Sequence, residues 1–362
     1  MHGCSPSGAT PTPRPRAPEA ALHALDAWAL RHPDVARGHA PLLVAYSGGA
    51  DSTALLLAVA QRWPQRVRAV HVHHGLQAAA DAFADHAQAC CAAWGVPLQV
   101  QRVQVVLTPG RSPEEAARAA RYAALAQQAQ ACGAAVLLAH HALDQLETVL
   151  LALTRGAGLP GLAAMPERFE RDGVTFGRPL LAADPQALRA QLAQAGVPWV
   201  EDPTNADPHP TRNRLRLQVL PALLQAFPHA PATFARSARH AAQAQALLQQ
   251  LAAEDLARIG DPPQLAALRA LPPPRAVNAL RLWLRQRHGA QASDAQWQAL
   301  AQQIQAARTR GQRIELRLGA GTVRRDGPVL RWRPDNASGA TTTAATTAAP
   351  TPPGSCPAES KS

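Results

Sequence analysis

Leu-Leu-Val-Ala, at residues 42–45, is followed after Tyr46 by Ser-Gly-Gly-Ala-Asp-Ser, at residues 47–52, and then by an apolar helical segment from Thr53 to Ala60. This order predicts a strand, a tight loop and a helix whose unpaired backbone N–H groups face outward. Such a corner binds phosphate, because the amides and the helix dipole both favour an anion. The Gly-Lys-Ser/Thr ending of a Walker loop is absent. A plain Gly-Gly turn is the structural alternative.

Asp51 lies inside this loop, where a carboxylate beside bound phosphate makes sense if Mg²⁺ bridges the two. A carboxylate in the first turn also stabilises a helix dipole. The two roles are compatible, so the sequence predicts Asp51 as a candidate Mg²⁺ ligand.

Short apolar runs alternate with helical segments after this corner. We expect strands at 42–46, 67–73, 98–105, 136–139 and 174–178, and helices that include 81–94, 113–132 and 143–154. The alternation predicts an α/β fold in which helices cover both faces of a parallel sheet. Ligands bind at the carboxyl ends of such strands. The loop at Ser47 and the strand ends at His73 and His140 should therefore converge at one edge.

The strands stop after about residue 216. We expect one long helix at 230–259, a break at Pro272–Pro274, a further helix through His288, and a β-hairpin with its turn at Asp326-Gly327. The predicted organisation is a poorly ordered segment with one potential helix at 1–38, a catalytic domain at 39–218, a mainly helical domain at 219–335 and a disordered low-complexity tail at 336–362.

The composition narrows the class of partner. The 362 residues carry a formal net charge of +11, which favours a polyanion such as nucleic acid, although a generally basic, solvated surface is the alternative. Neither a membrane-spanning apolar run nor a secretory h-region occurs, so we expect a cytoplasmic protein. The five cysteines form no C-x-x-C pair, which argues against a disulfide framework or a zinc site.

Three histidines, His71, His73 and His74, lie close together but do not predict zinc. On a strand His71 and His73 share one face while His74 points away, and no carboxylate or cysteine at ligand spacing supports a cluster. We expect His73 at the strand end near a nucleotide, and His71 packed inside.

Further motifs follow the loop in a fixed order. They are His71-Val-His-His-Gly-Leu76, Arg118-Ala-Ala-Arg121-Tyr122, His141-Ala-Leu-Asp144-Gln145-Leu-Glu147-Thr148, Arg155–Met165, Arg178-Pro-Leu180, Glu201-Asp-Pro-Thr-Asn205 and Arg212-Asn-Arg214. Together with Ser47–Ser52 they resemble the PP-loop ATP pyrophosphatase family, and within it the tRNA(Ile)-lysidine synthase family. The resemblance is close over about 40–220 and loose over 230–335.

The resemblance implies a PP-loop fold, like that of the adenine nucleotide alpha hydrolases, and an ATP-dependent reaction on tRNA(Ile) with a CAU anticodon. ATP, with Mg²⁺, would adenylate the wobble cytidine at its C2 oxygen, and free lysine would then displace AMP to give lysidine, which changes codon specificity from AUG to AUA. Two alternatives remain: another PP-loop tRNA-modifying enzyme such as a thiolase, and a non-catalytic RNA-binding protein. A thiolase requires paired cysteines, which Cys90-Cys91 does not resemble.

The resemblance also implies roles for individual residues. Those implied are Ser47, Gly48, Gly49, Ala50, Asp51, Ser52, His73 and Gly156 for ATP; Arg118, Arg121, Asp202 and Asn205 for the substrate; and Asp51, Asp144, Glu147 and Arg212 for catalysis. Relative to longer members, it implies a short form without the far C-terminal domain. It allows a homodimer, although the sequence does not reveal the oligomeric state.

Most of these residues have a structural alternative. Asp144 and Glu147 face one side of a helix start, where they would bind a lysine ammonium or Mg²⁺, or cap the helix. Arg118 and Arg121 would bind phosphate or remain solvated. Gly156 is either close to adenine or a plain helix cap, and the loop at 201–205 is also a candidate Asx turn.

Two positions depart from the family pattern. Leu143 stands where an aspartate is expected beside Asp144, which removes one expected polar contact. Pro210 stands where the family has an aromatic residue, which makes stacking there doubtful.

Overall fold

The computed structural model describes residues 14–73, 75, 80–105, 113–307, 309 and 311–335. The chain divides into two compact units, Met1–Ala246 and Leu247–Ser362. The predicted tail at 336–362, the first part of the predicted N-terminal segment and His74 lie outside the described residues. Within the described part of the chain, no helix combines the length and the apolar character that a membrane crossing needs.

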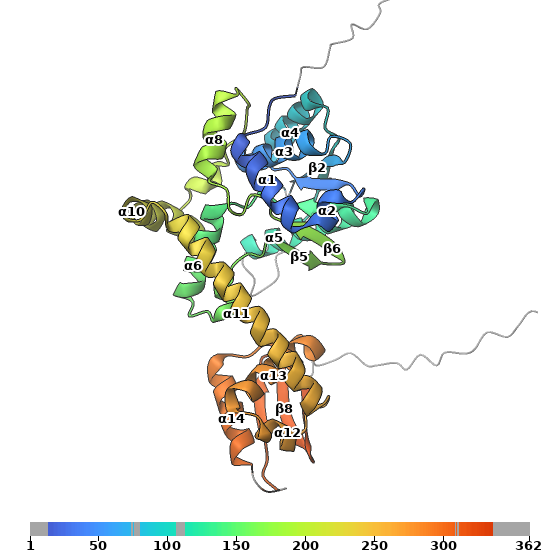
Figure 1. The fold of residues 1–362 in the computed structure, drawn as a ribbon, viewed down its shortest axis with the longest axis vertical. Coiled ribbons are helices and arrows are strands. Elements are labelled where there is room, and N and C mark those ends of the chain that lie inside the picture. Colours follow the sequence, from blue (N-terminus) through green and yellow to red (C-terminus); the bar gives the residue numbers. More distant parts are fainter. Residues whose placement is uncertain are drawn as a thin grey trace, which may run out of the picture. The chain divides into compact units, whose positions relative to one another are not determined.

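A six-stranded sheet forms the centre of the first unit, in the order β3-β2-β1-β4-β6-β5. Strands β2, β5 and β6 of this sheet are labelled in Figure 1. The strands are β1 (Leu42–Ala45), β2 (Val67–His73), β3 (Leu98–Arg102), β4 (Ala135–Leu137), β5 (Arg168–Arg171) and β6 (Val174–Gly177). All neighbours are parallel except β5 and β6. The predicted parallel sheet is therefore confirmed, and the sequence missed only its antiparallel edge strand β5. The chain reverses its direction of travel across the sheet between β1 and β4, where ligands bind in such folds.

Alternating side chains of the strands supply two cores. Leu42 and Val44 pack on one face with α1 (Glu19–Arg31), α3 (Ala50–Arg62), α4 (Ala80–Trp94) and α8 (Pro185–Gln194). Leu43 and Val70 pack on the other face with α5 (Pro113–Cys132). The two-residue period of a strand produces this division. Helix α3 is buried along nearly its whole length, so the loop that precedes it stands on a rigid base.

The N-terminal segment contains the helix that the sequence predicted as a potential one within 1–38, and its residues from 14 to 38 are better ordered than expected. Its residues from Glu19 onward form α1 and α2 (Pro33–Arg37), and α1 packs into the core. Ala21, Leu25 and Trp28 fall on one face of α1 and are at most 1% exposed. Gly177 leaves the space for this packing, because a Cβ there would lie 2.6 Å from Trp28 Cζ2.

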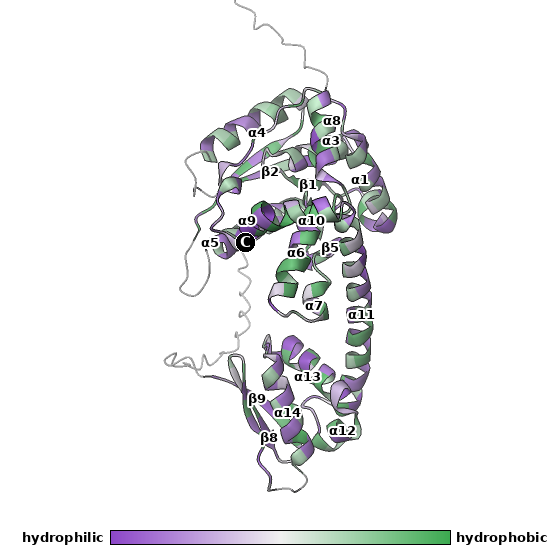
Figure 2. Ribbon diagram, turned by 90° about the vertical axis from the view of Figure 1, so that its left-hand side faces the viewer, coloured by the Kyte–Doolittle hydropathy of each residue, from purple (hydrophilic) through white to green (hydrophobic). Residues whose placement is uncertain are grey.

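The segments after β4 surround the carboxyl edge of the sheet. They are α6 (Ala142–Thr154), α7 (Leu159–Leu162), a 3₁₀ turn (Pro203–Ala206), α9 (Thr211–Arg214), a π-helical turn (Leu215–Val219) and α10 (Leu220–Ala226). Helix α6 is mostly apolar, as its green colour in Figure 2 indicates, and it buries Leu146 against Leu220 and Ala230.

The second unit begins inside α11 (Ala230–Ile259), at Leu247, and not at the predicted residue 219. One continuous helix crosses the boundary, and residues up to Ala230 pack on α6, so no loop in the sequence marks it. The rest of the unit comprises α12 (Leu265–Ala270), α13 (Pro273–His288), α14 (Asp294–Ala306), β7 (Glu315–Leu318), β8 (Gly321–Asp326) and β9 (Val329–Pro334).

This second unit is mainly helical and closes with a sheet, as predicted. The expected hairpin is β8 and β9, and β7 extends it to three antiparallel strands. The prolines at 272–274 start α13, where the first turn tolerates a missing N–H. Inside the unit Asp255 is fully buried, and Arg275 donates to both of its oxygens, at 2.6 and 3.0 Å.

Candidate active site

The loop from Ser47 to Ser52 forms the floor of the site. Helix α3 starts at Ala50, and in the described part of the chain no side chain caps its N-terminus. The Ser52 hydroxyl donates to Gly49 O at 2.9 Å and accepts from Ser47 N at 3.2 Å, which fixes the turn. Gly48 adopts a φ of +86°, and a Cβ there would lie 3.0 Å from Val200 Cγ2. The loop therefore presents open amides at a helix N-terminus, an arrangement that binds phosphate.

Asp51 extends into the same space. Its Oδ1 is buried and has no hydrogen-bond partner among the described residues, while Oδ2 lies 3.6 Å from His141 Nε2. Burial raises the pKa of Asp51, although His141 opposes this. A buried carboxylate oxygen without a partner is costly unless a ligand satisfies it. Oxygen donors are what Mg²⁺ prefers, so the residue fits a bridging Mg²⁺. Among the described residues, no group of three His, Cys, Asp or Glu side chains could hold a metal ion without further ligands.

The start of α6 brings a second carboxylate to the site. His141 caps the helix by accepting from Asp144 N at 3.4 Å, and Asp144 Oδ2 accepts from His141 N at 3.0 Å. Burial disfavours the charge on Asp144, but His141 and Arg212 together lower its pKa. The capping alternative is thus correct for Asp144, without removing it from the site.

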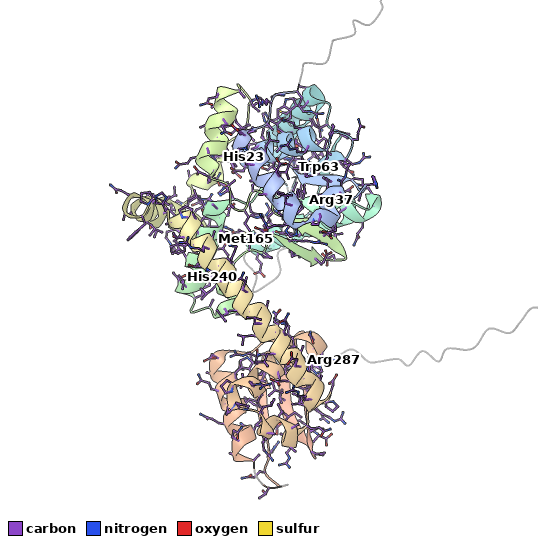
Figure 3. All side chains as sticks on the ribbon, viewed as in Figure 1. His23, Arg37, Trp63, Met165, His240 and Arg287 are labelled. Carbon is purple, nitrogen blue, oxygen red and sulfur yellow. The ribbon has the colours of Figure 1, made fainter. Side chains whose placement is uncertain are left out.

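Gln145, next along the motif, is a structural residue. Its side-chain amide donates to Met165 O at 2.8 Å and accepts from Met165 N at 2.9 Å. Met165 is labelled in Figure 3. This pair of bonds fixes the segment after α7 against the start of α6.

Glu147 is fully buried and is held by two arginines. Arg212 Nε donates to its Oε2 at 2.6 Å, and Arg216 Nε donates to its Oε1 at 2.7 Å. Both guanidiniums also lie 3.6 Å from Asp144 Oδ1. Because both oxygens are occupied, Glu147 fixes the arginines in place and is not open to a ligand ammonium.

A polar cavity of about 580 Å³ lies above these groups. It is lined by nine of the residues to which the resemblance gives a role: Ser47, Gly49, Ala50, Asp51, Arg121, Asp144, Glu147, Asp202 and Asn205. Asp202 also accepts from Thr204 N at 2.9 Å, so the Asx turn expected at this loop is present as well.

A second cavity, of about 240 Å³, adjoins the loop on the α5 face of the sheet. Its walls are mostly apolar and are made by Ala45, Tyr46, Val70, Val72, Leu125, Leu138 and Ala139, while Ser47, Gly49, Asp51, Ser52, Arg121 and His140 supply polar atoms. Asp51 and Arg121 line both cavities. The smaller, mostly apolar cavity could hold a flat heterocycle, and the polar cavity could hold polar groups of a ligand on the other side of the loop.

Apart from Gly48 in the loop itself, four predicted site residues line neither of the two cavities. His73 Nε2 lies 3.1 Å from Asp81 Oδ1, and neither cavity includes it. Gly156 follows the end of α6 as an exposed residue with φ +65°, which matches the plain cap. Arg118 lies over the ring of Tyr122 at 5.2 Å. Arg212 lies beside the polar cavity and is connected to it through its hydrogen bond to Glu147, which lines that cavity.

The sequence reasoning missed His71, His141, Arg189 and Arg216, which all line the polar cavity. His71 Nδ1 lies 3.0 Å from Tyr46 O, so it is His71 and not His73 that lies beside the loop. Arg216 follows Arg212 by four residues, a spacing that places both on one helix face. That spacing was the available signal for Arg216.

The two departures have visible consequences. Leu143 lines the polar cavity and packs in the small core around Leu146, so an apolar side chain takes the place of the expected carboxylate. Pro210 lies immediately before α9, at its N-cap.

These features define the class of protein. Residues 24–223 match the family model described as a PP-loop domain, and residues 264–327 match a TilS substrate binding domain. The U34-tRNA thiolase NcsA from Methanococcus maripaludis has a similar fold, with a TM-score of 0.52 at 14% identity over 61% of this chain and 77% of that one. The chain is thus an enzyme of the PP-loop, ATP-using class.

Relatives at higher identity narrow the class further. The chain is 57% identical over 291 residues to a tRNA(Ile)-lysidine synthase from Polaromonas naphthalenivorans, and the match covers 80% of this chain and 88% of that protein. A tRNA(Ile)-lysidine synthase from Bordetella pertussis is 43% identical over 82% of this chain and 94% of its own length. That from Pseudomonas putida is 47% identical over 67% of this chain and 60% of its own length. The chain belongs to the tRNA(Ile)-lysidine synthase family.

Proposed function

We propose that this chain ligates lysine to C2 of the wobble cytidine of tRNA(Ile) with a CAU anticodon. The C2 oxygen attacks the α-phosphorus of ATP, and pyrophosphate leaves. An amine of free lysine then attacks C2, loses a proton, and displaces AMP together with the former C2 oxygen. The product, lysidine, reads AUA in place of AUG.

The observation that supports this reaction most is the pairing of open loop amides with the partnerless Oδ1 of Asp51. A leaving pyrophosphate needs both hydrogen-bond donors and charge neutralisation. Asp51 is the residue that would hold Mg²⁺, which when bound neutralises the charge that develops on the leaving group. The amides of Ala50 and Asp51 and the Ser47 hydroxyl would orient the phosphates.

The arginines supply further positive charge. Arg121 is exposed and lines both cavities, so we assign it to a phosphate of ATP or to the anticodon. Arg212 and Arg216 are held by Glu147 at fixed positions beside Asp144, which orients them before the substrates bind. We expect them to stabilise the negatively charged adenylate.

The lysine substrate requires carboxylates near the reacting carbon. Glu147 is engaged by arginine, so we expect Asp144 and Asp202, which both line the polar cavity, to bind the lysine ammonium groups. Asn205 lines the same cavity and would add a neutral contact. Leu143 leaves the adjacent wall apolar, which suits the methylene chain of lysine.

The tRNA would also contact the second unit. Arg285 lies on the exposed face of α13, where it would bind a phosphate of the tRNA without reading sequence. Arg281, one turn earlier, is exposed as well but donates to Asp294 Oδ1 at 3.1 Å. We expect the reaction in the cytoplasm, where tRNA and ATP are both present. Sedimentation of the purified chain would distinguish a monomer from the homodimer that the resemblance allows.

The decisive experiment incubates the full chain with ATP, Mg²⁺, lysine and the CAU-anticodon tRNA and then identifies the modified nucleoside by mass. We expect a nucleoside with the mass of cytidine plus one lysine minus one water, with one AMP and one pyrophosphate formed for each. Asp51→Asn is the matched control, and we expect it to bind tRNA but not to exchange pyrophosphate into ATP. A tRNA that remains unmodified under these conditions would contradict the proposal.

A further inference from the structure

Arg178 begins the Arg178-Pro-Leu180 motif, to which the reaction above gives no role. Its side chain is buried, and every part of it is engaged within the protein. Nη1 donates to Pro166 O at 2.7 Å, Nη2 to Tyr122 Oη at 3.4 Å and Nε to His140 Nδ1 at 3.3 Å. The guanidinium also lies over the ring of Phe169 at 4.4 Å. An arginine held in this way orients its neighbours and is not open to a substrate phosphate.

The bond to His140 determines which ring nitrogen of that histidine carries a hydrogen. Guanidinium nitrogens only donate, so Nδ1 of His140 must accept and carries no hydrogen. A neutral imidazole with an acceptor at Nδ1 is a donor at Nε2. Burial lowers the pKa of His140 to about 3, an effect that Asp144 opposes and Arg178 reinforces, so the ring is neutral near pH 7. The Nε2–H is therefore a permanent neutral donor.

This donor has no partner within the described part of the chain. His140 is half-buried and lines the 240 Å³ cavity beside the phosphate-binding loop, where most of the remaining wall is apolar. A flat heterocycle could lie between Val70, Leu125 and Leu138. A single oriented donor in such a pocket discriminates among ligands, because a ligand without a matching acceptor leaves the donor unsatisfied.

We propose that Arg178 is a positioning residue that holds His140 as a fixed N–H donor to an acceptor nitrogen in the purine ring of the bound nucleotide. The inference rests on the proposed function only in taking ATP as the nucleotide. It explains why Arg178 and Tyr122, from two separate motifs, lie together behind His140, which lines the cavity. His140, and not the neighbouring His141, would contact the base.

The test uses ATP analogues in which one ring nitrogen is replaced by carbon. Calorimetry on the full chain without tRNA measures the affinity for ATP and for 1-deaza-, 3-deaza- and 7-deaza-ATP. We expect one analogue to bind about five- to tenfold more weakly than ATP, as for loss of one neutral hydrogen bond, and the other two to bind within about twofold. His140→Phe should lose this preference, and His140→Gln, which retains an N–H donor, should keep it.

A second pair of variants tests whether Arg178 orients the His140 ring or only stabilises the fold. Arg178→Met frees Nδ1 of His140, so the ring can adopt either tautomer, and the preference should fall below about threefold. Tyr122→Phe removes a different partner of Arg178 and should leave the preference unchanged. If the wild type bound all three analogues with equal affinity, or if His140→Phe kept the preference, this inference would be overturned but the proposed function would stand. Absence of any ATP binding would overturn the proposed function as well.

Discussion

At the scale of single residues, Glu147 has both carboxylate oxygens occupied by arginine side chains. Its side chain is 1% exposed, whereas those of Arg212 and Arg216 are 24% and 37% exposed. A buried carboxylate is tolerated when charged donors satisfy both oxygens. The more exposed ends of the arginines remain near Asp144. Glu147 therefore acts on the reaction through the two residues that it holds.

Glu147→Gln should release this arrangement. Removing one partner from a buried ion pair leaves uncompensated charge, so we expect the free energy of unfolding to fall by about 2–4 kcal/mol. Turnover should fall at least about tenfold, because the arginines lose their fixed positions, while tRNA affinity should change less than about twofold. Urea unfolding, steady-state kinetics and filter binding measure the three quantities.

Glu170→Gln provides the matched control. Glu170 also pairs with an arginine, Arg168, but its side chain is 58% exposed. An exposed pair contributes little, so we expect a change within about 1 kcal/mol and unaltered turnover. Equal effects of the two substitutions would show that the burial of Glu147 has no special consequence.

The histidines illustrate what residue-level prediction achieved. The strand period correctly placed His71 and His73 on one face of β2, but it could not tell which of them lies beside the loop. That depends on how far β2 extends past β1, which is a property of the folded sheet. The positions of Asp51 and Asp144 beside the polar cavity were predictable. Asp51 lies in the loop and Asp144 at a helix start, and these segments of adjacent sequence form their surroundings.

At the scale of elements, the corner between β1 and α3 depends on Gly48. Its φ of +86° lies in the region that favours glycine, and Val200 and His86 crowd the position where a side chain would begin. Gly156 has a similar φ, of +65°, but nothing lies within 4 Å of its Cβ position. The two glycines differ mainly in the space around them.

Gly48→Ala should therefore be more damaging than Gly156→Ala. We expect Gly156→Ala to cost about 1 kcal/mol of stability from backbone strain, and Gly48→Ala to cost about 2–3 kcal/mol because overlap with Val200 adds to it. Only Gly48→Ala should weaken ATP binding, since only that position shapes the loop. Thermal unfolding and calorimetric titration with ATP would measure both effects, and equal ATP affinities would contradict this account.

Helix α1 is part of the first unit, and its two faces allow an internal control. Trp28 is 1% exposed and Leu30 is 80% exposed on the same helix. Trp28→Ala should lower the free energy of unfolding by about 3–5 kcal/mol through the cavity it leaves. Leu30→Ala should change it by less than about 0.5 kcal/mol. Similar urea midpoints for the two variants would indicate that α1 does not contribute to the core.

The strands and helices differ in how well the sequence predicts them. Strand β1 is a continuous apolar run and is almost wholly buried, and β2 is buried at most of its positions although it carries Arg68, His71 and His73, so both strands were identified. Strand β5 reads Arg-Phe-Glu-Arg and lies at the edge of the sheet, so it carries no such signal. Helix α1 was underestimated because its apolar residues follow a proline-rich stretch.

At the scale of the whole molecule, the net charge of +11 is spread over both units. Many arginines are already paired with carboxylates, as Arg62 is with Asp26 and Arg287 is with Asp261. A polyanion would therefore meet those arginines that have no acidic partner. Binding of tRNA through phosphates releases counterions, whereas binding of ATP in a defined cavity depends less on them.

The affinity for tRNA should fall at least about tenfold between roughly 50 and 200 mM salt. Over the same range the affinity for ATP should change less than about threefold, because the loop binds phosphate through oriented amides. Filter binding and calorimetry at matched salt concentrations test this pair of slopes. Equal slopes would argue that both ligands are held by the same diffuse charge.

Cys132 ends α5, close to where β4 begins, and is thus at the opposite edge of the sheet from the nucleotide cavities. It is exposed, whereas Cys90 and Cys91 are buried, and burial raises the pKa of the Cys91 thiol to about 12. A maleimide dye would consequently attach at Cys132 once Cys4 and Cys356 are replaced by serine. Fluorescence anisotropy could then follow the arrival of tRNA in real time without the label obstructing catalysis.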